Sequence, residues 1–382
     1  MAKLLQAFIN SEKAGGLVLI GCTLVSLVVA NSSLGHGYHN FWQSTLFTQS
    51  IEYWINDGLM AVFFLLIGLE LKQEIIAGKL SNIKAAALPI FAAVGGMLVP
   101  AAIYIAINYN TPTQAGAGIP MATDIAFALA ILSLLGMRVP VALKVFLTAL
   151  AVIDDLGAIV VIAIFYTHTI IWAKLGIALG IFCLLLVLNK CKIKNLIPFV
   201  TGGIVMWYFM LHSGVHATIT GVLLAITIPY GNHKKAGLLV LQNFLHKPVA
   251  FIILPLFALA NTAISFNVNI TELVTTKYSV GIALGLLLGK PIGIFSGIYF
   301  AVAAGICKLP PGVNKTSIFG VGILGGIGFT MSIFITLLAF NDEYLINNVK
   351  LVIVITSAIA AIIGYIFLRI TLPKARCRNV AE

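Results

Sequence analysis

Long apolar stretches, each about the length needed to cross a lipid bilayer, recur along the whole chain. A transmembrane helix needs about 20 predominantly apolar residues, and the 382 residues contain about twelve such stretches. Soluble domains devote about a quarter of their residues to charged side chains, whereas these make up 9% of this chain and hydrophobic residues 60%. The sequence therefore predicts an all-α polytopic membrane protein.

The predicted helices are bounded by Gly, Pro, Asn and charged residues. The first six cover roughly 14–30, 57–77, 86–108, 119–135, 141–167 and 172–189. The second six cover roughly 197–212, 215–230, 247–266, 280–300, 317–340 and 348–369. We expect residues 1–382 to form a single transmembrane domain, with roughly 14–369 embedded in the membrane and short termini outside it.

The basic residues are distributed unevenly between the two sides of the predicted bundle. Of the 23 Lys and Arg residues, nineteen fall on the side of the N-terminus, including Lys72, Arg138, Lys234 and Lys235. Three fall opposite (Lys174, Lys277 and Lys350), and Lys290 lies inside a span. Because cytoplasmic loops carry the excess of Lys and Arg, both termini are predicted to be cytoplasmic. The net charge of +11 then reflects membrane topology, and no nucleic-acid partner is expected.

The cysteines and the longest loop further limit the kinds of site and structure that the chain can contain. The five cysteines are scattered without CxxC spacing, so neither a disulfide framework nor a zinc site is expected, and we expect no bound cofactor. The longest loop on the side opposite the termini, residues 31–56, contains no Lys or Arg and is rich in aromatic and β-branched residues in its second half. It is predicted to be either a short β-hairpin or an irregular connector with interfacial aromatics.

Two adjacent aspartates occupy the middle of one predicted span. Asp154 and Asp155 lie about 20 Å of helical rise from either end of the span 141–167. A charge there costs roughly 2.5–3.5 kcal/mol even on the most lenient scale, and a helix-association role would normally use Ser, Thr or Asn instead. Carboxylate oxygens suit hard cations such as Na⁺ or Li⁺, and buried neighbouring carboxylates also retain protons. The pair is predicted to bind a monovalent cation or protons.

A second aspartate site lies at a weak helix start. Gly118 and Pro120 precede Thr123 and Asp124 in GIPMATDIAFALAIL, which predicts an interrupted helix whose free N–H and C=O groups need polar partners. Asp124 could compensate these dipoles or could bind the ion directly, and the sequence leaves both roles open.

A lysine and a glycine cluster complete the polar features inside the spans. Lys290, followed by Pro291, lies at the centre of its helix and needs a buried carboxylate, for which Asp154 and Asp155 are the candidates. Such a pair could be mechanistic or purely structural. GILGGIGFTMS contains Gly325, Gly326 and Gly328, which indicate either an unwound segment or close helix packing.

These segments together resemble the bacterial NhaA family of sodium/proton antiporters. The resemblance is carried by WINDGLMAVFFLLIGLELKQE, MATDIAFALAIL, VPVALKVFLTALAVIDDLGAIVVIAIFYT, SGVHATITGVL, GKPIGI and GILGGIGFTMSIFI, in order from about Asn10 to Arg369. The interrupted helices are the fourth and the eleventh, each the middle of a triplet (3–5 and 10–12), and the two triplets start on opposite sides of the membrane. Interrupted helices at matching positions of inverted repeats mark the ion site of several transporters, the NhaA family among them.

The resemblance implies electrogenic export of Na⁺ or Li⁺ in exchange for a larger number of protons, by alternating access, in the bacterial inner membrane. It implies that Asp155 is the central cation and proton carrier, with Asp154 beside it and Lys290 as the salt-bridge partner. Thr123 and Asp124 match the unwound crossing. The resemblance also implies a homodimer formed through roughly residues 41–56, with membrane lipid around it.

The resemblance also bears on pH regulation, for which the family has an acidic residue near the start of the ninth helix. This chain has Gln242 in LVLQNFLHKP instead, and an amide cannot titrate. Glu70 and Glu74 in GLELKQE match the family, and His246 is present, while His216 adds a second imidazole that could respond to pH. We therefore expect a pH response with a shifted or weaker profile.

Two other functions would also use charged residues inside the membrane. An intramembrane aspartyl protease needs two aspartates, but Asp124 and Asp154 stand in MATD and AVID rather than in YD and GxGD signatures, and a neighbouring lysine would disturb a proton-sharing pair. A passive cation channel is disfavoured because an unpaired Lys290 at the midplane would repel cations. We expect a transporter and not an enzyme.

Overall fold

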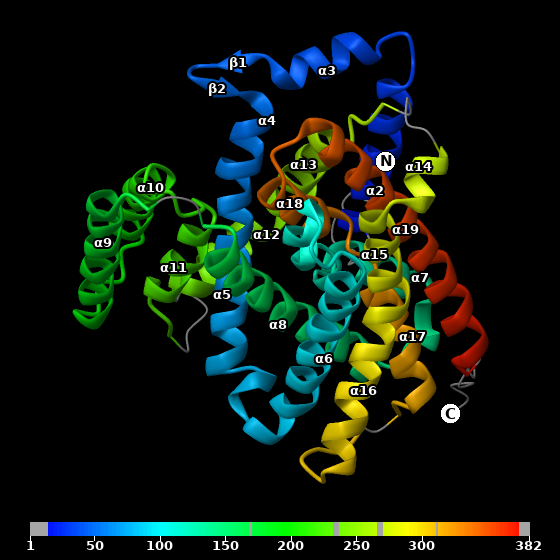
Figure 1. Ribbon diagram of the computed structural model, residues 1–382. Coiled ribbons are helices and arrows are strands. Elements are labelled where there is room, and N and C mark those ends of the chain that lie inside the picture. Colours follow the sequence, from blue (N-terminus) through cyan, green and yellow to red (C-terminus); the bar gives the residue numbers. More distant parts are fainter. Residues whose placement is uncertain (1–13, 168–169, 232–236, 266–269, 311, 374–382) are drawn as a thin grey trace, which may run out of the picture.

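The computed structural model describes residues 14–167, 170–231, 237–265, 270–310 and 312–373. Lys234, Lys235 and both chain ends, which contributed to the predicted orientation, lie outside these residues. The described chain is a bundle of helices with one small two-stranded ribbon (Figure 1).

Each of the twelve predicted spans contains a helix. These helices are α2 (Ala14–Ala30), α5 (Met60–Ile76), α6 (Ile83–Ile107), α7 (Ile125–Leu134), α8 (Val141–Phe165), α9 (Trp172–Lys190), α10 (Ile197–Leu211), α11 (Ile219–Thr227), α13 (Leu254–Asn261), α16 (Lys290–Ala303), α18 (Phe329–Ala339) and α19 (Glu343–Thr371). Among the described residues, six helices are long and apolar enough to cross a membrane alone, or up to nine when each bent pair is taken as one span. The predicted all-α polytopic membrane protein is confirmed.

Shorter elements extend or join these helices. They are α3 (Gly35–Gln43), α4 (Ile51–Tyr53), α12 (Gly237–Pro248), α14 (Ile270–Thr275), α15 (Lys277–Leu284) and α17 (Lys315–Gly325), the 3₁₀ segments η2 (Lys79–Ser81), η3 (Pro112–Met121) and η4 (Gly136–Arg138), and the π segments η1 (Trp54–Leu59), η5 (Val249–Ile253) and η6 (Gly285–Gly289). The π segments lie inside longer helical runs, as in α15–η6–α16. Such wide turns occur frequently at functional sites, and η6 ends immediately before Lys290.

The loop between α2 and α5 contains a hairpin, one of the two alternatives that the sequence left open. Strand β1 (Thr45–Leu46) pairs antiparallel with β2 (Gln49–Ser50), and the pair projects beyond one end of the bundle (Figure 1). The indole N–H of Trp54 donates to the carbonyl of Leu46 at 2.9 Å, and the Ser50 hydroxyl accepts from the N–H of Tyr53 at the start of α4. Helix α3, in the first half of this loop, was not predicted. We call this end of the bundle the hairpin side and the opposite end, which carries most Lys and Arg residues, the basic side.

Helices α6 and α16 pack backbone against backbone. A Cβ atom added at Gly95 of α6 would lie 2.1 Å from the carbonyl oxygen of Gly293, and one added at Gly297 would lie 2.1 Å from that of Phe91. Only glycine permits such an approach, which is typical of helices packed inside a membrane. The contact holds α16, and with it Lys290, against the neighbouring helix.

Lys72 binds the carbonyl groups at the end of the neighbouring helix α11. Its ammonium, on α5, donates to the carbonyl oxygens of Ile226 and Ile228 at 2.6 Å each and approaches that of Ala225 at 3.4 Å. The last carbonyls of a helix have no partner within it, and a cation at this end also interacts favourably with the helix dipole. Lys72 therefore caps α11 and ties it to α5.

Replacing Lys72 by methionine tests this cap, because methionine keeps an unbranched apolar chain but removes every donor. We expect the free energy of unfolding to fall by about 1–3 kcal/mol, the cost of leaving buried acceptors unpaired. The purified variant in detergent should show a lower melting temperature. Lys194→Met, at an exposed lysine of the basic side, is the matched control, and equal melting temperatures for the two variants would contradict the capping role.

Candidate functional site

The fourth span is interrupted at Thr123 and Asp124, as predicted. Segment η3 ends at Met121, α7 begins at Ile125, and the two axes differ by 43°. The Asp124 carboxylate accepts from the N–H of Phe127 at 2.9 Å, and its own N–H donates to the carbonyl of Ile327 at 2.7 Å. Asp124 thus compensates the free donors at the start of α7.

The eleventh span is interrupted in the same way. Helix α17 ends at Gly325 and α18 begins at Phe329, with a bend of 46°. The second carboxylate oxygen of Asp124 accepts from the N–H and the hydroxyl of Thr330 in the first turn of α18. One buried carboxylate therefore caps both half-helices that begin at the crossing, which is the charge-compensating arrangement of the two left open by the sequence.

The glycines of the second break lie in an unwound segment and also permit close helix packing, the two interpretations that the sequence left open. Residues 326–328 lie between two helices, so the chain is unwound there. A Cβ atom at Gly326 would lie 2.3 Å from the carbonyl oxygen of Leu286, and one at Gly328 would lie 2.1 Å from the hydroxyl of Ser332. The small residues thus permit close packing at the same place.

The ion pair of the site joins α8 to α16. The Lys290 ammonium donates to Oδ2 of Asp154, and both side chains are fully buried. The Thr123 hydroxyl lies 2.8 Å from the same oxygen and 2.8 Å from the carbonyl of Gly325. Since this hydroxyl has one proton and two acceptors, it connects the aspartate to the second helix break. Of the two predicted partners for Lys290, the structure selects Asp154.

Asp155 has different surroundings from its neighbour. Its side chain is 1% exposed, and its Oδ1 atom has no hydrogen-bond partner within the part of the chain that the structure describes. The Oδ1 atom of Asp154 is also without a partner there. Because buried carboxylate oxygens are costly to leave unbound, these two atoms are the strongest candidates for binding an ion or a proton.

A cavity of about 400 Å³ lies on the basic side of this site. It is lined in part by Glu70 and His246, by Thr148 of α8, and by Ile125, the residue after Asp124. The imidazole Nδ1 of His246 lies 3.9 Å from the Glu70 carboxylate. One helical turn before His246, the buried Gln242 Oε1 has no hydrogen-bond partner among the described residues.

The residues predicted to respond to pH do not form one cluster. Glu70, Glu74, Gln242 and His246 lie on α5 and α12. His216 lies elsewhere, and its Nε2 atom is 2.8 Å from the carbonyl of Tyr166, which follows α8 on the hairpin side. The structure therefore separates His216 from the other four.

Several hydroxyl groups of the site were not singled out in the sequence. Thr330 binds Asp124, the Ser332 hydroxyl donates to the carbonyl of Ile119 at 2.7 Å, and the Ser357 hydroxyl accepts from the N–H of Phe329 at 3.1 Å. A serine or threonine within an apolar helix is the signal that could have identified them, because a polar group buried in hydrocarbon needs a partner.

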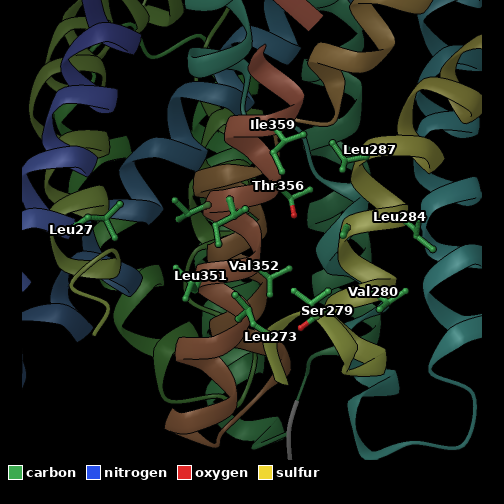
Figure 2. A pocket seen from close by; sticks show the side chains of 14 residues that line it. Leu27, Leu273, Ser279, Val280, Leu284, Leu287, Leu351, Val352, Thr356 and Ile359 are labelled. Carbon is green, nitrogen blue, oxygen red and sulfur yellow. The ribbon is translucent and has the colours of Figure 1, made fainter. Parts of the chain in front are cut away.

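A large groove on the surface of the bundle is not part of this site. Its volume is about 730 Å³, and it is lined by residues of α2, α14, α15, η6 and α19. Figure 2 shows that Ser279 and Thr356 are the polar residues among mainly aliphatic ones. A mainly apolar lining of this kind suits hydrocarbon, and the residues that line the groove include no carboxylate.

Comparison with known proteins identifies the family to which this chain belongs. The family model described as Na⁺/H⁺ antiporter 1 matches residues 6–368. The Na⁺/H⁺ antiporter NhaA of Flavobacterium psychrophilum is 64% identical over 98% of both chains. The NhaA protein of Cytophaga hutchinsonii is 55% identical over 100% of this chain and 99% of its own, and that of Dechloromonas aromatica is 54% identical over 96% of both. The chain therefore belongs to the NhaA family of Na⁺/H⁺ antiporters.

Proposed function

We propose that this protein exports Na⁺ or Li⁺ from the cytoplasm in exchange for protons, with Asp154 and Asp155 as the shared binding groups. The observation that carries the proposal is the pair of unbound carboxylate oxygens, one on each aspartate, buried between two interrupted helices. Carboxylate oxygens bind hard cations and also bind protons, so the two ligands compete for the same atoms.

The charges of the site support an electrogenic exchange. Two ionised aspartates, the Lys290 ammonium and one bound Na⁺ sum to zero. When both aspartates are protonated instead, the ammonium leaves one positive charge. Carrying these two states across the membrane in opposite directions moves net charge, so the membrane potential contributes to the driving force.

Alternating access follows from the interrupted helices. Short half-helices joined by unwound segments can move without stretching a continuous helix, and the ion site lies where they cross. Asp124 and Thr123 hold this crossing together through hydrogen bonds to α18 and to Gly325. In this proposal the basic-side cavity, which reaches Ile125 next to Asp124, is the route from the cytoplasm.

The other functions considered have less support. Both oxygens of Asp124 already accept hydrogen bonds from helix starts, and Asp154 is bound to Lys290, so neither suits an aspartyl protease. The relatives compared above are all named antiporters, which favours coupled exchange over a passive channel. We expect no bound cofactor, and Na⁺ or Li⁺ is cargo.

The hairpin supports a homodimer. The strands Thr45–Leu46 and Gln49–Ser50, within the segment 41–56 expected to dimerise, project beyond the bundle (Figure 1), and the Phe47 side chain at their turn is 89% exposed. A second copy of the chain, in the surrounding lipid, would cover this apolar turn.

The collapse of a proton gradient in inverted membrane vesicles tests the proposed exchange. Adding Na⁺ or Li⁺ should dissipate the gradient with the wild type, whereas Asp155→Asn should reduce dissipation to the background of vesicles lacking the protein, because an amide cannot exchange a proton for a cation. Asp342→Asn, at the exposed start of α19, should behave as the wild type, since asparagine caps a helix equally well. A wild type without cation-dependent proton movement would refute the proposal.

Gln242 bears on the pH response of this exchange. It lies one turn before His246, so Gln242→Glu places a carboxylate near the imidazole, which stabilises the imidazolium. We expect the midpoint of the activity profile, measured from acid to alkaline pH, to move to higher pH in this variant. Gln114→Glu on the hairpin side adds the same charge far from His246 and should leave the midpoint unchanged. Identical profiles for all three proteins would exclude a pH role for this position.

A further inference from the structure

A second, partly buried ion pair lies near the hairpin, away from the aspartate site. The Lys350 ammonium of α19 is 3.4 Å from the Glu52 carboxylate of α4, although 298 residues separate them in sequence. The Lys350 side chain is 6% exposed and that of Glu52 is 26% exposed. In the sequence Lys350 counted only toward the topology, and Glu52 fell within the segment 41–56 expected to form the homodimer.

The pair joins two different groups of helices. Glu52 begins the run α4–η1–α5, and this run packs against α11, α12 and α13. Helix α19 instead packs against α17, α18 and α15, which surround the second helix break. The Lys350–Glu52 contact is therefore a polar link between the helices below the hairpin and the helices that carry the crossing.

Helix α19 connects this link to the ion site. Ser357 lies seven residues, or about two turns and 10 Å of rise, after Lys350, so both occupy nearly the same face. The Ser357 hydroxyl accepts from the N–H of Phe329 at the start of α18, and the next residue, Thr330, binds Asp124. Leu351, Val352 and Thr356 point the other way, into the groove of Figure 2. Helix α19 and two hydrogen bonds thus connect Lys350 to the crossing.

The pair is formed in a state whose cavity lies on the basic side. The cavity lined by Glu70 and His246 lies there, whereas on the hairpin side of the site polar contacts join neighbouring segments. The Tyr166 hydroxyl, for example, donates to the carbonyl of Ala115 at 2.7 Å. Opening the hairpin side requires the ends of helices on that side to separate, and Glu52 and Lys350 hold two such ends together.

We propose that Lys350 and Glu52 are positioning residues of the exchange cycle and form a lock on the hairpin side, closed while the site faces the basic side and broken when it opens to the hairpin side. The inference rests on the proposed function, because it assumes alternating access. Breaking the lock shifts the population toward the state open to the hairpin side, since the lock stabilises only the other state.

The apparent KM for Na⁺, measured separately from each side in inside-out and right-side-out vesicles, tests the lock. Glu52→Gln should raise the KM several-fold on the basic side and lower it on the hairpin side. The charge-swapped variant Glu52→Lys with Lys350→Glu should restore KM values close to those of the wild type. The conservative variant Lys350→Arg keeps the ion pair and should also show values close to the wild type. Asp342→Asn removes an exposed carboxylate from the start of the same helix while keeping its cap, and is the matched control, expected to keep both KM values.

The outcomes separate the lock from the exchange itself. If the wild type exchanges Na⁺ for protons but Glu52→Gln keeps both KM values, the lock is wrong and the proposed function stands, even if the variant melts at a lower temperature. If folded charge-swapped and Lys350→Arg proteins both keep the altered KM ratio of Glu52→Gln, the lock is also wrong. Absence of cation-dependent proton movement in the wild type would instead overturn the proposed function.

Discussion

The buried ion pair between Lys290 and Asp154 is the interaction on which the rest of the site depends. Ionic groups lose their hydration in the membrane interior, and leaving one of a buried pair without its partner costs about 3–5 kcal/mol. The direct contact between Lys290 and Asp154 offsets this cost, and the Thr123 hydroxyl donates to the same carboxylate oxygen. Asp155, next in sequence, is left with an unbound oxygen. The pairing occupies only Oδ2 of Asp154, so one oxygen on each aspartate is without a partner among the described residues.

The cost of burying polar groups without partners also explains the crossing of the interrupted helices. Free backbone N–H groups in hydrocarbon need partners, and Asp124 provides them for the starts of both α7 and α18. Glycines at the second break allow close approach to η6, the segment that precedes Lys290. Asp124 therefore stabilises the scaffold of the crossing, while in the proposed exchange the pair on α8 binds the ion.

Much of the fold could be predicted because lipid leaves few choices. Apolar length located the spans, and the glycines at 325–328 and the Thr123–Asp124 pair located both breaks. The π segments, α3 and the 3₁₀ segment η3 escaped prediction, since none has a periodicity that distinguishes it in sequence. Contacts between distant residues, such as Thr330 with Asp124 and Lys350 with Glu52, depend on helix packing. Lys350 in particular looked like an ordinary interfacial lysine until its burial was known.

The central claim is that Na⁺ and protons compete for the same two carboxylates. The most direct measurement is the release of protons when Na⁺ is added to the purified, wild-type protein in weakly buffered detergent, repeated at several pH values. The account predicts proton release with Na⁺ but not with choline, a weaker apparent Na⁺ affinity at lower pH, and no release from Asp155→Asn. Na⁺ binding that releases no protons and keeps the same affinity at every pH would contradict it.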